Sequence, residues 1–125
     1  MDGVPPKSRV DFWLAPPHCQ AMDTLSRLAA TIAERRSADP ETSWVARLNA
    51  RGVPVIARKL GEEAVETVVA ALSGSREDLV GEAADLLFHL MVLLDAKDVR
   101  FEEVLAELER RDGTSGIAEK AVRDQ

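Results

Sequence analysis

Two groups of acidic residues stand in otherwise apolar stretches of this chain. Glu62, Glu63 and Glu66 form the first group, and Glu82 and Asp85 form the second. A carboxylate is costly to bury unless a partner compensates its charge, and facing carboxylates raise each other's pKa unless a cation lies between them. Hard divalent ions such as Mg²⁺ prefer a site made only of oxygen atoms. The two groups therefore predict a helical protein that holds Mg²⁺ for phosphate chemistry.

Helical spacing places the carboxylates of each group on one face. Residues three apart, such as Glu63 and Glu66 or Glu82 and Asp85, lie about 60° apart around an α-helix. Only a short turn separates the two stretches, so their helices are expected to pack antiparallel and to bring the acidic faces together. The expected result is a cage of these four carboxylates, with Lys59 on the same stripe. Mg²⁺ held by few carboxylates keeps several waters, which leaves positions open for phosphate oxygens and for a nucleophile.

These residues also allow interpretations other than a metal site. A run of glutamates is more often a solvated helix face, but Asp85 and His89 are the only residues between Ala83 and Leu94 that are not apolar. We therefore expect the second group to lie in a core with few polar neighbours. A di-iron site needs Glu-x-x-His from two helices, and the residue three after Glu82 is an aspartate. His89 is expected to be a packing histidine, with proton transfer as the alternative, and Trp44 is expected in the core.

The elements that would position these residues are all helical. Leu25, Leu28, Ala29 and Ile32 recur at the spacing of an amphipathic helix, and no strand-like alternation of any length is present. The expected helices cover about 23–36, 54–72, 76–96 and 101–110, with a short segment at 43–52, a loop at 112–116 and a basic tail after it. The predicted fold class is all-α, a four-helix bundle.

Length and composition exclude several classes of protein. The 125 residues indicate one domain at 22–125, preceded by an irregular arm at 1–21 that holds four of the six prolines. The net charge of −6 and the pI of about 4.9 argue against a nucleic-acid partner. The single cysteine excludes an intrachain disulfide, and no membrane span or signal peptide is visible, so a cytoplasmic location is expected.

Three motifs resemble the all-α nucleoside triphosphate pyrophosphohydrolases related to MazG, and within them the phosphoribosyl-ATP pyrophosphohydrolase family. The matching segments are Lys59-Leu60-Gly61-Glu62-Glu63-Ala64-x-Glu66, Glu82-x-x-Asp85-Leu86-Leu87-Phe88-His89-Leu90 and Ser115-Gly116-Ile117-x-Glu119-Lys120-Ala121-x-Arg123. Ser43-Trp44 stands where this family usually has Ser-Tyr, and Val45 stands where Thr is common. The resemblance extends over about 22–123.

This resemblance implies Mg²⁺-dependent hydrolysis of phosphoribosyl-ATP to phosphoribosyl-AMP and pyrophosphate in histidine biosynthesis, with Mn²⁺ as the alternative ion. It implies that Glu63, Glu66, Glu82 and Asp85 are metal ligands and that Glu62 is a further ligand or orients the water. It also implies that Lys59, Lys120 and Arg123 contact phosphates, with Ser43 as a weaker candidate. Water is expected to attack directly.

The apolar stretch at 76–96 also predicts a homodimer, because one bundle alone would expose too much apolar surface. The active site is expected near the interface, completed by the basic tail of the partner subunit, and a higher oligomer is the alternative. Two other functions stay open at this point. One is a housekeeping enzyme that hydrolyses dCTP or aberrant nucleotides, and the other is a non-enzymatic acidic helical interaction module.

Overall fold

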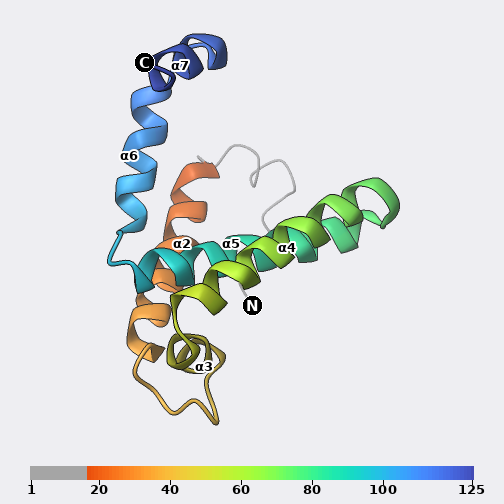
Figure 1. Cartoon of the computed structure of the whole chain (residues 1–125), viewed down its shortest axis with the longest axis vertical. Coiled ribbons are helices and arrows are strands. Elements are labelled where there is room, and N and C mark those ends of the chain that lie inside the picture. The colour runs from red at the N-terminus through yellow and green to blue at the C-terminus, as the bar shows by residue number, and fades with distance from the viewer. Residues whose placement is uncertain (1–16) are drawn as a thin grey trace, which may run out of the picture.

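The computed structural model describes residues 17–125, and this part of the chain is all-α, as predicted (Figure 1). The described residues form six helices and no strand. The helices are α2 (Pro17–Arg35), α3 (Trp44–Arg51), α4 (Val53–Ser73), α5 (Arg76–Ala96), α6 (Phe101–Arg111) and α7 (Gly116–Arg123). Among these residues no helix is long and apolar enough to cross a membrane.

Helices α4 and α5 form a long antiparallel hairpin that carries both acidic groups. Each helix has 21 residues, and α4 begins with a proline in its first turn, where the missing N–H costs no hydrogen bond. Ser75 and Asp78 form a reciprocal capping box at the start of α5, with the Ser75 hydroxyl accepting from the Asp78 amide at 3.1 Å. In Figure 1 the turn of this hairpin projects away from the other helices.

The hydrophobic core lies at the other end of the hairpin, where α2 and α3 pack on it. Its buried members come from these four helices: Ile32, Val45, Leu48, Ile56, Met91 and Val92. Burying side chains of this size stabilises the fold by about 1.5–3 kcal/mol each. The core therefore anchors the first turns of α4 and the last turns of α5, and it holds the hairpin from one end only.

The outer half of the hairpin is exposed and apolar. We call the exposed apolar side chains of this half, taken together, the hairpin apolar face, and they are Val65, Val68, Val69, Leu72, Leu79 and Val80. Ala83, Ala84 and Asp85 on α5 are also exposed. In the single chain, the expectation that the second acidic group lies in a core is thus wrong for Asp85, because α2 packs only on the far half of α5, whereas Glu82 is half-buried and its Oε2 atom is buried.

Two predicted boundaries differ from the structure. Helix α2 begins at Pro17 rather than near Asp23, so residues 17–21 are helical; the rest of the expected arm lies outside the described residues. Proline is well tolerated in the first turn of a helix, and Pro17 begins one here rather than preventing it. The basic tail is also a helix, α7, because the Ser115 hydroxyl caps it by accepting from the Ala118 amide at 3.1 Å.

Candidate active site

Three of the four predicted metal ligands meet between α4 and α5. Carboxylate oxygens of Glu63, Glu66 and Glu82 lie within 4.8 Å of one another. Asp85 lies one turn after Glu82 on α5 and is exposed, and its carboxylate is outside this group of three. Its charge still acts on the group, because it raises the pKa of both Glu63 and Glu82. The structure therefore places a compact carboxylate cluster where the two acidic stripes face each other.

Thr67 ties the two helices together at the level of this cluster. Its hydroxyl lies 2.7 Å from the Glu63 carbonyl oxygen and 3.2 Å from the Glu82 carbonyl oxygen. The first contact is within α4, whereas the second crosses to α5. This bridge sets the register in which Glu63 and Glu82 face each other. Thr67 was not among the predicted site residues, although a threonine in the apolar stretch one turn after Glu63 was a visible signal.

The electrostatics of the cluster are those of like charges held together. Burial is the largest cause that raises the pKa of Glu63, which is only 6% exposed, and the hydrogen bond and charge of Glu66 raise it further. Burial and Glu66 raise the pKa of Glu82 in the same order. The Oε2 atoms of Glu63 and Glu82 are buried without a hydrogen-bond partner among the described residues. Two unpartnered oxygens in an all-carboxylate site fit a hard divalent cation.

Lys59 lies at the edge of the cluster and partly offsets its charge. Its Nζ is 3.3 Å from Glu62 Oε2 and 3.8 Å from Glu63 Oε1. The same Nζ lies 6.0 Å from the centre of the Trp44 ring, at the outer range of a cation–π contact. Glu62 is exposed and also pairs with Arg58 at 3.6 Å. One lysine is therefore placed where it can move from these carboxylates to an incoming anion.

His89 is held by contacts to both of its ring nitrogens. The Trp44 indole N–H donates to Nε2 at 3.5 Å, so Nε2 is the acceptor and Nδ1 carries the proton. Nδ1 then donates to the Asp85 carbonyl oxygen at 2.7 Å. These contacts support the packing role that we expected for His89. They also correct the prediction for Trp44, which is 42% exposed and lies beside Lys59 rather than in the core.

The remaining predicted residues lie apart from the cluster in the single chain. Ser43 is buried, and its hydroxyl caps α3 by accepting from the Ala46 amide at 3.2 Å, which explains this residue without a substrate. Lys120 and Arg123 are exposed on α7. Figure 1 shows that α6 leads away from the α4–α5 hairpin and places α7 at its far end. The structure thus brings Lys59, but not α7, to the carboxylates of the same chain.

A groove of about 270 Å³ opens beside the cluster. Glu66 and Glu82 line it, and it continues along the hairpin to Gly74 and Asp78. A separate cavity of about 350 Å³ is lined by residues of α2, α5 and α6, and none of the cluster carboxylates lines it. A further open pocket of about 560 Å³ is lined by Glu62 and Glu66, so the carboxylates are open to a ligand from this pocket as well as from the groove.

Comparison with known proteins gives one consistent result. The profile of the phosphoribosyl-ATP pyrophosphohydrolase family matches residues 25–112, which include α4 and α5 entirely. A phosphoribosyl-ATP pyrophosphatase of Novosphingobium aromaticivorans is 70% identical over 101 residues, which cover 81% of this chain and 94% of that protein. Proteins with the same name from Erythrobacter litoralis and Rhodobacter capsulatus are 66% and 61% identical over 102 residues, covering 82% of this chain and 98% and 99% of their own lengths.

The raised pKa values predict how the metal-free protein responds to pH. The pKa values of Glu63 and Glu82 in the folded state lie above their ordinary value of 4.5. A carboxyl group shifted in this direction stabilises the fold at pH values below its ordinary pKa. This contribution is lost as pH rises through the raised pKa. Glu66→Gln removes one negative charge, so in EDTA the variant should lose less stability than the original protein between pH 4.5 and pH 8. Urea unfolding at both pH values measures the difference.

Glu34→Gln, at an exposed position on α2, is the matched control and should behave as the original protein does. Equal losses of stability in the original protein and in Glu66→Gln would contradict the electrostatic account of the cluster.

Proposed function

The chain belongs to the phosphoribosyl-ATP pyrophosphohydrolase family, and from this membership we propose that it hydrolyses phosphoribosyl-ATP to phosphoribosyl-AMP and pyrophosphate in histidine biosynthesis. The observation that carries the proposal is the carboxylate cluster, which lies within the segment that the family profile matches. The carboxylate cluster also argues against a non-enzymatic interaction module. In such a module the buried and unpartnered carboxylate oxygens would cost free energy and serve no purpose.

We propose that Glu63, Glu66, Glu82 and Asp85 hold Mg²⁺, with Mn²⁺ as the alternative ion. The ion, when bound, neutralises charge on the triphosphate and lowers the pKa of a water molecule. The three clustered carboxylates supply ligands from two helices, and Asp85 extends the acidic surface by one turn toward solvent. The unpartnered Oε2 atoms of Glu63 and Glu82 support this assignment.

The side chains around the cluster would bind and orient the substrate. Lys59 would leave Glu62 for a phosphate oxygen, and Glu62 would then be free to orient the attacking water or to add a ligand. The oxygen of water would bond to one of the two phosphorus atoms of the α–β anhydride as the bond from that phosphorus to the bridging oxygen breaks. This separates phosphoribosyl-AMP from pyrophosphate, and the water proton passes to a carboxylate or to solvent. Lys120 and Arg123 would offset the negative charge that builds on the phosphates, with Ser43 as a weaker contact.

We further propose that two copies of the chain assemble through the hairpin apolar face. Exposed apolar patches of this kind are rare on monomers and mark interaction sites. A second copy is the occupant that we propose, because α7 lies away from the hairpin that carries the carboxylates of its own chain (Figure 1). In a symmetric dimer each surface meets the same surface of the partner, and the partner's α7 would bring the basic side chains to the groove.

Pyrophosphate release with Mg²⁺ tests the proposed reaction on phosphoribosyl-ATP, ATP and dCTP. Phosphoribosyl-ATP should be strongly preferred, and EDTA should abolish turnover. Glu66→Gln and Asp85→Asn should each lower kcat/KM by roughly 100-fold or more, which is the loss typical of removing one group that stabilises charge in the transition state.

Glu34→Gln again serves as the control and should keep its activity. Preference for dCTP would move the protein to a housekeeping function, and no activity on any of the three substrates would revive the interaction module. Full activity of both carboxylate variants would contradict the cage.

The assembly predicts that a charge on the hairpin apolar face prevents dimerisation. Val68→Asp should shift the protein from dimer to monomer in sedimentation velocity, because a buried aspartate at an apolar interface has no partner. Val53→Asp changes an exposed valine at the opposite end of α4 and should leave the dimer intact. A monomeric original protein would refute the assembly outright.

Shared active sites predict that two defective variants complement each other. Lys120→Ala should raise the KM for phosphoribosyl-ATP by about 10-fold or more, since hydrogen bonds to charged groups contribute about 1.5–3 kcal/mol. Its Mg²⁺ affinity, measured by thermal shift, should stay unchanged. Mixing Lys120→Ala with Glu66→Gln and exchanging subunits should restore activity, because one site of the mixed dimer is then intact. Without any recovery, Lys120 would have to act on its own subunit or not at all.

A further inference from the structure

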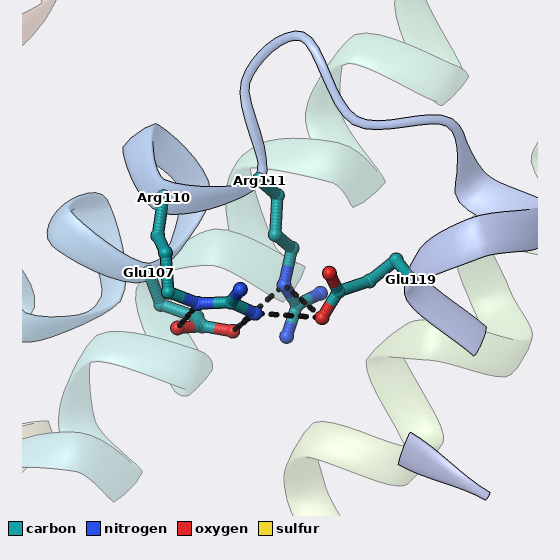
Figure 2. Close-up of polar contacts among 4 residues, drawn as sticks. All are labelled: Glu107, Arg110, Arg111 and Glu119. Atoms are coloured by element: carbon teal, nitrogen blue, oxygen red, sulfur yellow. Dashed lines mark hydrogen bonds and ion pairs between the residues drawn. The ribbon is translucent and has the colours of Figure 1, made fainter. Parts of the chain in front are cut away.

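A network of two glutamates and two arginines joins α6 to α7 (Figure 2). We call it the α6–α7 latch, and its members are Glu107, Arg110, Arg111 and Glu119. Arg110 donates to both oxygens of Glu107, at 2.9 and 2.8 Å, and to Glu119 Oε1 at 2.6 Å. Arg111 Nε donates to Glu107 Oε1 at 2.8 Å and lies 3.7 Å from Glu119 Oε1. Figure 2 shows that Glu119 reaches across from α7, while the other three side chains come from α6.

Glu119 is an unusual anchor for a helix. It is the one buried residue of α7, at 6% exposed, whereas the apolar Ile117 and Val122 on the same helix are 87% and 64% exposed. An amphipathic helix is ordinarily held by its apolar residues. A buried carboxylate needs its charged partners, and removing one partner of such a pair is strongly destabilising. Within the single chain α7 is therefore held to α6 by charge rather than by apolar packing.

Two members of the latch, Glu107 and Arg110, have pKa values shifted toward their charged forms. The hydrogen bonds from Arg110 and Arg111 lower the pKa of Glu107 to about 2, and Glu107 and Glu119 together raise the pKa of Arg110 further above its ordinary range. Two carboxylates face two guanidinium groups, so the charges balance within the four residues. The carboxylate cluster on the hairpin differs, because Lys59 offsets its negative charge only in part.

The latch lies next to the basic residues of α7. Glu119 directly precedes Lys120, and Arg123 lies one helical turn after Glu119. The three residues therefore share one short rigid helix. The connection from α6 contains Gly113, whose φ of 76° is in the left-handed region that glycine adopts freely. A glycine at that point permits other directions for α7. The pairing of Glu119 with Arg110 and Arg111 selects one of them.

We propose that Glu119 is a positioning residue, which through the α6–α7 latch fixes the direction in which Lys120 and Arg123 face the substrate phosphates. The role toward phosphates rests on the proposed function. The anchoring of α7 does not, and it can be measured without any substrate.

Steady-state kinetics of Glu119→Gln tests the positioning role. This variant keeps the size of the side chain and removes its charge. It should lower kcat/KM for phosphoribosyl-ATP by about 10- to 100-fold, the loss expected when a phosphate-binding group is misplaced by about 1 Å. Most of the change should lie in KM, as with Lys120→Ala. The Mg²⁺-induced thermal shift should stay unchanged, because the carboxylate cluster is on other helices, and Glu119→Asp should recover part of the loss.

Glu109→Gln is the matched control, since Glu109 is an exposed glutamate of α6 that forms no side-chain contact with the latch. It should keep the kinetics of the original protein. Normal kinetics of Glu119→Gln would overturn the positioning role. Arg110→Ala provides a second check, because in a latch its effect and that of Glu119→Gln should not add in the double variant. Additive effects, with a much larger loss for Arg110→Ala alone, would show that Arg110 binds substrate directly and would also overturn the proposal.

Amide hydrogen exchange over residues 116–123 tests the anchoring itself. Exchange should be faster in Glu119→Gln than in the original protein or Glu109→Gln, and an unchanged rate would overturn the latch. If the original protein released no pyrophosphate from phosphoribosyl-ATP, the proposed function and the role toward phosphates would fail. The exchange result would still decide whether Glu119 holds α7.

Discussion

Bringing several carboxylates together between two helices costs free energy, and much of this structure serves to hold them there. Glu63, Glu66 and Glu82 repel one another within 4.8 Å, and burial raises the pKa of two of them. The contacts that offset this free-energy cost lie outside the cluster. The core at one end of the hairpin, the capping box at its turn and the Thr67 hydroxyl between its helices keep α4 and α5 in register despite the repulsion.

The two charged networks of this chain have opposite electrostatic character. In the carboxylate cluster like charges share a site, two oxygens have no hydrogen-bond partner within residues 17–125, and the pKa values of Glu63 and Glu82 rise. In the α6–α7 latch each carboxylate meets a guanidinium group, and the pKa of Glu107 falls to about 2. Because the charges of the α6–α7 latch balance one another, holding the fold is a sufficient role for this network. The cluster is not balanced, which is the property expected of a site that binds a cation and an anionic substrate.

The single chain also leaves two features without partners, and both point to a second copy. The hairpin apolar face is exposed, and the helix that carries Lys120 and Arg123 lies away from the carboxylates of its own chain (Figure 1). A second copy would cover the hairpin apolar face, and its α7 would bring Lys120 and Arg123 to the carboxylates. The arrangement would also let an acidic protein of net charge −6 bind a polyphosphate, since Lys120 and Arg123 of the partner's α7 would supply positive charge locally.

Local patterns in the sequence determined the helices, the acidic stripes and the family, because helical periodicity and motif spacing depend only on residues a few positions apart. The same reasoning failed where distant residues decide the outcome. It did not predict that Trp44 would lie beside Lys59, or that α2 would leave the outer half of α5 exposed. Nor did it predict that Glu119 would pair with arginines of the preceding helix. Burial and ion pairing depend on which helix packs on which, and only the tertiary structure decided that.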